Sequence, residues 1–221
     1  MPRVLVINPN SNMDVTRGID GALAGLREGT GASVEVMGLQ GTPHGIESQR
    51  DVDVVAAPVA RAVAAADGRA DAFVIACFSD PGLQGAREAT RKPVLGIAAS
   101  GMLTALGVGN AVGVISILAS SLPRHWRYYR AMGIAERVAG DYPVGAGVAE
   151  LADASAMGER MRDTGERLVH ETGADVLVLG CAGMAQYRDP LEQALGVTVI
   201  DPAQAAVGLA ITAASMGYRT L

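Results

Sequence analysis

Lysine is almost absent from this chain. The single lysine, Lys92, precedes Pro93 at the start of an apolar run, so we expect it at the opposite end of the sheet from the loops that follow the strands. A pyridoxal phosphate enzyme needs a Schiff-base lysine in its active site. The position of Lys92 therefore argues against this class of enzyme.

Aromatic residues and clustered positive charge are scarce too. Aromatics make up 4% of the chain, and the net charge is −5 with the arginines scattered along the sequence. A nucleic-acid binder would show a basic patch or stripe, so no nucleic-acid partner is expected. Hydrophobic residues account for 49% of the 221 residues, enough for a substantial core. We expect a globular protein with a small-molecule partner.

Long apolar runs are missing as well. The N-terminal MPRVLVINPNSN contains a short apolar run and one basic residue, which fits neither a signal peptide nor a membrane span. We therefore expect a cytoplasmic protein with no membrane partner. In that reducing compartment Cys77 and Cys181 are expected as free thiols. With three dispersed histidines they form no zinc-binding spacing, so no metal site is expected.

Several enzyme signatures are absent. GVGNAVG has its third glycine one residue too late for a dinucleotide-binding GxGxxG motif, and it precedes a strand instead of following one. The sequence has no Walker A, GxSxG or HExxH motif. These absences disfavour redox, ATP-driven, serine-hydrolase and zinc chemistry.

Short apolar runs alternate with helical stretches along the whole chain. The expected strands are 3–8, 33–39, 72–77, 94–98, 111–117, 175–181 and 197–201. Helical spacing marks the segments between them, such as GERMRDTGERLVHETG with a glycine at its expected C-terminal end. Strands that are apolar on both faces and separated by helices indicate an α/β fold with parallel sheets.

The pattern occurs twice, about 104 residues apart. DAFVIACFSDPGL resembles DVLVLGCAGMAQY, PVLGIAASG resembles VTVIDPAQA, and VLVINPNSN resembles VGVISILAS. We infer two pseudosymmetric, Rossmann-like lobes, residues 1–98 plus 203–221 and residues 99–202. The helix after VLGIA and the last helix are expected to cross between them. Because ligands bind beyond the carboxyl ends of parallel strands, the expected active site is the cleft between the lobes.

The two cysteines take the same place in the two copies, at the end of a strand. A lone cysteine is most simply a small buried hydrophobe, and a disulfide is a further alternative. The matched positions favour a catalytic pair instead. Pro81 is predicted at the first position of a helix beside Cys77. Such a helix N-terminus would lower the pKa of the thiol.

Other polar residues are predicted at the same end of the sheets. The loop NPNSN after the first strand would serve as an ordinary capping turn, but its position also predicts ligand contact. His44, in the loop after the second strand, is predicted near the ligand, with proton transfer as the weaker hypothesis. His125 and His170 lie in charged helical contexts and are predicted to be solvated.

Two acid/base groups on opposite sides of a small cleft suit the inversion of a stereocentre. A thiolate on one face would remove a proton from a carbon next to a carbonyl, and a thiol on the other face would return one. Backbone N–H groups in the loops would have to stabilise the enolate oxygen that forms in between. This chemistry needs no cofactor.

The segments VLVINPNSN, IACFSDPGL and VLGCAGMA together resemble the hydantoin and allantoin racemases of the aspartate/glutamate racemase superfamily. The resemblance covers essentially the whole chain. It implies a cofactor-independent racemase, expected as a homo-oligomer, in which Cys77 and Cys181 are the two bases. The residues that it places around the substrate are Asn8, Pro9, Asn10, Gly45, Phe78, Ser79, Ser116, Ile117, Ala182 and Gly183.

The residues after each cysteine depart from the wider superfamily. Amino-acid racemases of this fold resemble one another in an Asn-Thr pair that helps to hold a carboxylate. Here Phe78-Ser79 and Ala182-Gly183 follow the cysteines, and no arginine lies in these turns. We therefore expect a neutral cyclic amide as substrate, namely a 5-substituted hydantoin, with allantoin as the alternative.

Other classes stay open. Arylmalonate decarboxylases resemble single-cysteine versions of the site and fit less well. Maleate isomerases also use two cysteines, and aspartate/glutamate racemases share the fold. A different class is a two-lobed, non-catalytic binding protein for a small cyclic metabolite, in which the cysteines are only packed.

Overall fold

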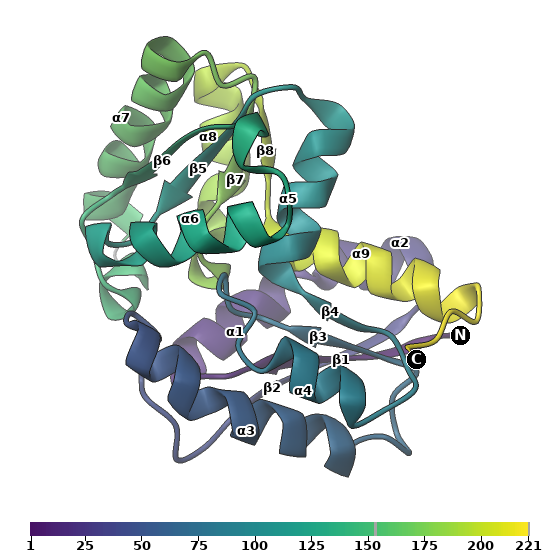
Figure 1. Ribbon diagram of the computed structural model, residues 1–221. Coiled ribbons are helices and arrows are strands. Elements are labelled where there is room, and N and C mark those ends of the chain that lie inside the picture. The colour runs from purple at the N-terminus through teal and green to yellow at the C-terminus, as the bar shows by residue number, and fades with distance from the viewer. Residues whose placement is uncertain (153, 221) are drawn as a thin grey trace.

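The strands form two four-stranded parallel sheets (Figure 1). The computed structural model describes residues 1–152 and 154–220, so Asp153 of the second predicted lobe and Leu221 of the first lie outside the described residues. The strands are β1 (Arg3–Asn8), β2 (Ser33–Gly38), β3 (Ala72–Ile75), β4 (Val94–Gly96), β5 (Val112–Ser116), β6 (Val138–Pro143), β7 (Val176–Leu179) and β8 (Thr198–Ile200). The sheet orders, β2-β1-β3-β4 and β6-β5-β7-β8, correspond strand for strand. The predicted pseudosymmetric α/β fold is confirmed.

The first sheet is covered by helices on both faces, which explains why its strands are apolar throughout. On one face Val4 and Val6 join a buried cluster with residues of α1 (Met13–Ala22) and α9 (Pro202–Ser215). On the other face Leu5 and Ile7 pack with α3 (Gln49–Ala65) and α4 (Leu83–Glu88). The short α2 (Ala24–Thr30) leads from α1 to β2.

The second sheet is built in the same way. Ile115 and Leu177 pack with α7 (Ala154–Thr172) and α8 (Arg188–Leu195) on one face. Val112 and Val114 pack with α5 (Ile97–Val108) and α6 (Leu122–Ala131) on the other. Short 3-10 helices lie in the connections: η1 (Ala119–Ser121), η2 (Ala135–Arg137), η3 (Val148–Ala152) and η4 (Ala182–Tyr187).

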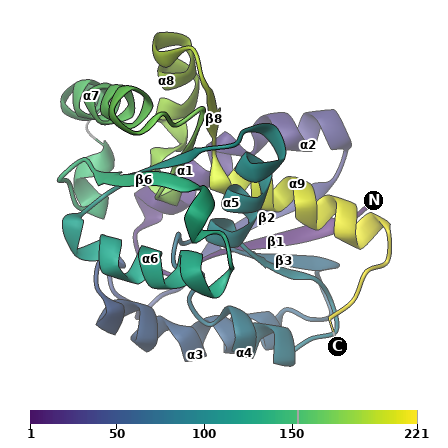
Figure 2. The same cartoon turned by 45° about the horizontal axis from the view of Figure 1, so that its top comes forward.

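Two helices cross between the lobes, as the sequence predicted. α5 follows β4 of the first sheet but packs on the second, and α9 follows β8 of the second sheet but packs on the first. The two helices lie against each other at the junction (Figures 1 and 2). Gly101 permits a close approach there, because a Cβ atom at this position would lie 2.8 Å from Cβ of Pro202. The two lobes are therefore joined through a shared core.

The predicted strands all occur, but β6 is missing from the prediction. Its sequence, VAGDYP, contains Gly140, Asp141 and Pro143, which are residue types depleted in strands. β6 lies at the edge of its sheet, where a proline is tolerated. The run 94–98 is also divided differently, since α5 begins at Ile97.

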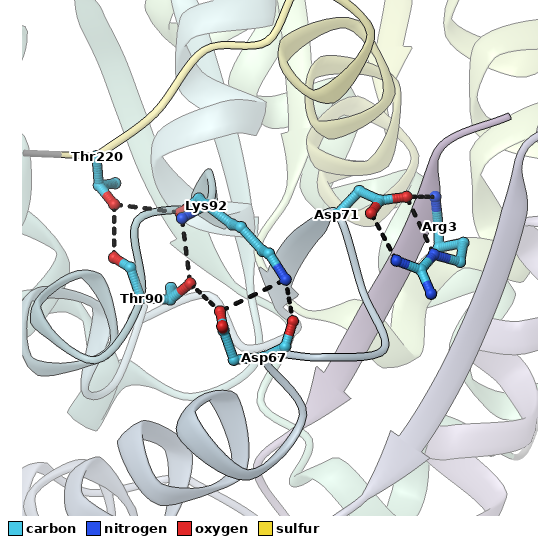
Figure 3. Close-up of polar contacts among 6 residues, drawn as sticks. All are labelled: Arg3, Asp67, Asp71, Thr90, Lys92 and Thr220. Carbon is cyan, nitrogen blue, oxygen red and sulfur yellow. Dashed lines mark hydrogen bonds and ion pairs between the residues drawn. The ribbon is translucent and has the colours of Figure 1, made fainter.

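Lys92 lies at the opposite end of the first sheet from Cys77, as predicted, because it precedes β4 whereas Cys77 follows the parallel β3. Figure 3 shows Lys92 with its polar partners. Its ammonium group hydrogen-bonds the backbone carbonyl of Asp67 and lies 3.6 Å from the Asp67 carboxylate. The C-terminal segment is attached to the same edge, where Thr220 Oγ1 donates to the carbonyl of Thr90 at 2.8 Å. Every helix of the described residues is too short or too polar to pass through a lipid bilayer.

Candidate active site between the two thiols

Cys77 and Cys181 occupy equivalent positions in the two lobes. β3 and β7 each end two residues before the cysteine. The residue in between, Ala76 or Gly180, still donates its N–H to the neighbouring strand, at 2.8 Å in both lobes. Both thiols are free. The parallel strands thus deliver a thiol to the carboxyl end of each sheet, where ligands bind in such folds.

The two thiols line one small cavity. Its volume is about 30 Å³, room for a water molecule but not for a small organic ring. The predicted site residues in its wall are Asn10, Cys77, Phe78, Ser79, Ile117, Cys181 and Ala182. The structure adds Val15, Ile46, Ala76, Ser121, Arg124, His125, Val148 and Gly180. A substrate can enter only if some of these side chains move.

The other predicted substrate-binding residues do not line this cavity; they are Asn8, Pro9, Gly45, Ser116 and Gly183. Gly45 instead allows two loops to approach, since a Cβ atom there would lie 3.2 Å from Cβ of Val148. Gly183 borders a neighbouring pocket. The sequence placed all of these residues at the carboxyl ends of the strands, but it could not tell which side chains of each loop line the cavity.

Asn8 and Ser116, the last residues of β1 and β5, are buried in hydrogen-bond networks behind the wall. Nδ2 of Asn8 donates to Oδ1 of Asn10 and to Oγ1 of Thr16, each at 2.9 Å. The Ser116 hydroxyl donates to the carboxylate of Asp141. Both residues position cavity-lining neighbours.

Burial raises the pKa of Cys77 to about 12 and that of Cys181 to about 11. A negative charge on Cys181 raises the pKa of Cys77 further, whereas the backbone N–H groups of Ser79 and Gly183 act in the opposite direction. The prediction of a lowered thiol pKa is therefore wrong for both cysteines. The free-energy cost of removing water from a thiolate exceeds the stabilisation that the backbone N–H groups provide.

The turn after Cys77 caps a different helix from the predicted one. α4 begins at Leu83, two residues later than the predicted start at Pro81. Asp80, with a φ of 44°, instead accepts hydrogen bonds from two N–H groups in the first turn of α5, both at 2.9 Å. Gly96 makes room for it, because a Cβ atom at Gly96 would lie 2.0 Å from Cγ of Asp80.

His125 is buried in the cavity wall, so the prediction that it is solvated is wrong. Its Nδ1 lies 2.9 Å from Oδ2 of Asp141, which also accepts a hydrogen bond from the Tyr129 hydroxyl at 2.9 Å. The ring of Phe78 meets the imidazole edge to face, with centroids 5.4 Å apart. Sequence reasoning missed this network because Asp141 lies on the unpredicted β6. The one available signal was the spacing of His125 and Tyr129, one helical turn apart.

Arg124, also on α6, is the second residue that sequence reasoning missed. It is only 9% exposed and lines the cavity. Its Nε donates to Oγ of Ser79 at 2.9 Å, and its Nη2 donates to Oγ of Ser121 at 3.2 Å. The turns after the cysteines carry no arginine of their own, but α6 brings one to the Cys77 turn from elsewhere in the chain.

A larger pocket of about 650 Å³ adjoins the cavity and shares Val15, Val148 and Ala182 with it. His44 is exposed and borders this pocket rather than the thiol cavity, and His170 is exposed on α7, as predicted. Within residues 1–152 and 154–220, no group of three or more His, Cys, Asp or Glu side chains could hold a metal ion.

The chain is similar to known racemases along nearly its whole length. The family model for Asp/Glu/Hydantoin racemase matches residues 4–210. A hydantoin racemase of Pseudomonas sp. (strain NS671) is 36% identical over 220 residues, covering 99% of this chain and 88% of the relative. One of Paenarthrobacter aurescens is 33% identical over 221 residues, covering 99% and 93%. The structure of an allantoin racemase from Klebsiella pneumoniae matches with a TM-score of 0.94 at 30% identity, over 100% of this chain and 91% of that one. The chain belongs to the Asp/Glu/hydantoin racemase family.

Proposed function

We propose that this chain is a cofactor-independent racemase of 5-substituted hydantoins. The observation that carries the proposal is the pair of free thiols at matched positions of two lobes, lining one cavity. The similarity to hydantoin racemases of two organisms supports the reaction class. The turns after the thiols, which lack a carboxylate-holding pair, support a neutral ring as substrate.

In the proposed reaction, the thiolate of one cysteine removes the proton from C5 of the ring. The C5–H bond breaks, an S–H bond forms, and the electron pair moves into the ring to give an enolate with its charge on the C4 oxygen. The other cysteine then gives its thiol proton to the opposite face of C5. Its S–H electron pair stays on sulfur as a thiolate, and the carbonyl forms again. Cys77 and Cys181 exchange these roles for the other enantiomer.

The electrostatics of the cavity favour one negative charge at a time. Because charge on Cys181 raises the pKa of Cys77, the ionised pair is a thiolate facing a thiol, as the reaction requires. Burial raises both pKa values, so the thiolate fraction at neutral pH is small and grows with pH. We expect kcat/KM to rise roughly tenfold per unit between about pH 6 and pH 8, after subtraction of spontaneous racemisation. A flat profile in this range would contradict a thiolate base.

The set of residues in the cavity wall supports two different roles for the proposed binding residues. We assign direct contact with the ring to Asn10, Phe78, Ser79, Ile117 and Ala182, which line the cavity. Asn8, Pro9, Gly45, Ser116 and Gly183 hold the surrounding loops. The 5-substituent would extend past Val148 and Ala182 into the adjoining pocket, which these residues share with the cavity.

Allantoin is the second candidate substrate. Gln186 and Gln204 line the adjoining pocket; their Nε2 groups donate to backbone carbonyls, and their Oε1 atoms can accept hydrogen bonds from a ureido substituent. The match to an allantoin racemase structure favours the same substrate. An alkyl or aryl hydantoin would use the apolar part of the same wall.

The cellular setting is part of the proposal. We propose a cytoplasmic homo-oligomer, and the two free thiols are consistent with a reducing compartment. The lobe boundaries, 1–98 plus 203–221 and 99–202, stay a prediction. The packing of α5 on the second sheet and of α9 on the first supports them.

The test is racemisation in deuterated water. Enantiopure 5-benzylhydantoin and allantoin are incubated separately with the protein, and optical rotation and deuterium at the stereocentre are followed together. We expect both to change faster than without protein, for at least one substrate. The double variant Cys77→Ser/Cys181→Ser is the matched control and should give the spontaneous rate. If the parent protein accelerates neither substrate, the chain is better described as a binding protein.

A further inference from the structure

Arg124 is a largely buried cation, and the carboxylate of Asp51 acts on its charge without forming an ion pair with it. Its hydrogen-bond partners, the hydroxyls of Ser79 and Ser121, are neutral and take only two of the five N–H donors of a guanidinium. Among residues 1–152 and 154–220, no carboxylate forms an ion pair with it. A largely buried charge that lacks an ion-pair partner is unfavourable unless a ligand supplies one. Arg124 therefore suits an anion bound in the cavity.

The charges around the cavity are arranged unequally. Arg124 contacts the turn that carries Cys77, and its positive charge favours the Cys77 thiolate. The charges that act on Cys181 are negative and come from Glu47 and Asp201. The positive charge of Arg124 thus acts at the Cys77 side of the cavity, where the negative charge of Asp80 opposes it, whereas both charges that act on Cys181 are negative.

We infer that Arg124 is the anion-binding residue of the thiol cavity and that it donates hydrogen bonds to the enolate oxygen of the ring. The identity of this anion rests on the proposed function. A guanidinium offers planar, fixed N–H donors, and in a dehydrated cavity such donors stabilise developing charge far more than they do in water. The oxygen that becomes negative is then held at the Cys77 side of the cavity, where the Arg124 guanidinium lines the wall.

The kinetic test compares three variants. Arg124→Gln removes the charge, and Arg124→Lys keeps it without the planar fork. Arg127→Gln is the matched control: Arg127 lies one turn further along α6, is exposed, and donates to Oε1 of Gln49 at 2.9 Å. We expect Arg124→Gln to lower kcat about 100-fold with little change in KM, because the charge exists only after proton removal. Arg124→Lys should recover part of the loss, and Arg127→Gln should behave like the parent. Thermal unfolding of each variant identifies any that fail to fold.

A binding test separates this inference from the proposed function. Barbiturate, a planar ring anion, and unsubstituted hydantoin, a neutral ring, are titrated calorimetrically into the parent protein, Arg124→Gln and Arg127→Gln. We expect the parent and Arg127→Gln to bind barbiturate at least about tenfold more tightly than hydantoin, and Arg124→Gln to lose this preference. If folded Arg124→Gln keeps both the preference and the parent kcat, the inference is wrong. If the parent racemises no hydantoin, the proposed function fails, but the barbiturate preference still decides the role of Arg124.

Discussion

The helices that follow β4 and β8 begin next to the two thiols, and each lobe caps its helix differently. In the second lobe Asp201 is itself the N-cap of α9, and its Oδ1 accepts the N–H of Gln204 at 2.7 Å. In the first lobe the N-cap position of α5 is Gly96, which has no side chain. The capping carboxylate there belongs to Asp80, from the turn after Cys77.

This difference shows what the pseudosymmetry preserves. A carboxylate caps the equivalent helix in both lobes, but it comes from a different part of the chain. As a consequence the Cys77 turn is attached to α5 and, through the hydroxyl of Tyr128, to α6. The segment after Cys181 is attached instead to η3, because the side chains of Gln186 and Tyr187 donate to the backbone carbonyl of Leu151. The backbone repeats between the lobes, whereas the polar surroundings of the two thiols have diverged.

Replacing one of the two thiols at a time should have the largest effect, a loss of racemisation. Cys77→Ser and Cys181→Ser should each lower racemisation about 1000-fold or more, because inversion needs a proton donor and an acceptor on opposite faces. Each variant should still exchange the C5 proton of one enantiomer for deuterium, and the two variants should favour opposite enantiomers. Polarimetry and proton NMR in deuterated water measure the two effects. Racemisation at the parent rate by either variant would rule out the two-base pair.

The two capping carboxylates should contribute unequally to stability. Asp80→Ala removes a buried carboxylate that accepts two backbone N–H groups and a tyrosine hydroxyl, and we expect a loss of about 3 kcal/mol in the free energy of unfolding. Asp201→Ala removes an ordinary N-cap and also a buried oxygen, Oδ2, that has no partner, so about 1 kcal/mol is expected. Urea unfolding of the two variants tests the difference. Equal losses of unfolding free energy would mean that a capping carboxylate from a distant turn and one from the N-cap residue itself contribute equally to stability.

The first lobe should accept the capping arrangement of the second. In the Asp80→Ala background, Gly96→Asp would place a carboxylate at the N-cap of α5, in the space that the Asp80 side chain has left. We expect it to restore about 1 kcal/mol, the usual contribution of an N-cap. In the parent protein the same substitution should destabilise, since its Cβ atom would lie 2.0 Å from Cγ of Asp80. Urea unfolding of the single and double variants measures the stabilisation expected in the Asp80→Ala background and the destabilisation expected in the parent. Destabilisation in both backgrounds would refute the equivalence of the two caps.

Much of this arrangement could be predicted from local sequence, because the strands are apolar runs and the two thiol segments repeat. What local patterns could not supply are the contacts made by α6. His125 looked solvated because its neighbours along the chain are charged, yet its partner Asp141 lies on an edge strand with no apolar alternation. Arg124 reaches Ser79 only because the two lobes face each other. The thiol pKa values also depend on how tightly the cavity closes, which no turn sequence specifies.

The two lobes also differ at the ends of the sheets opposite the thiols, in the partners of an aspartate that precedes the equivalent strands β3 and β7. Asp71, before β3, pairs with the Arg3 guanidinium at 2.8 Å (Figure 3). Asp175, before β7, instead accepts the backbone N–H groups of Ala111 and Asn110. The Arg3 side chain lowers the pKa of Asp71 to about 2, so the stability that this pair provides is complete above about pH 4 and is lost as the pH falls toward 2.

Arg3→Ala should therefore flatten the acid side of the stability profile. Asp71 keeps the backbone N–H of residue 3 in this variant, so it comes to resemble Asp175, which has backbone donors only. We expect a smaller loss of unfolding free energy between about pH 4 and pH 3 in the variant than in the parent, with a minor change at pH 7 because the pair is partly exposed. Urea unfolding at each pH measures this, with Arg17→Ala, which removes a more exposed helical ion pair, as the control. An unchanged acid slope would show that the backbone N–H group alone holds the Asp71 carboxylate in its charged form, as backbone donors do for Asp175.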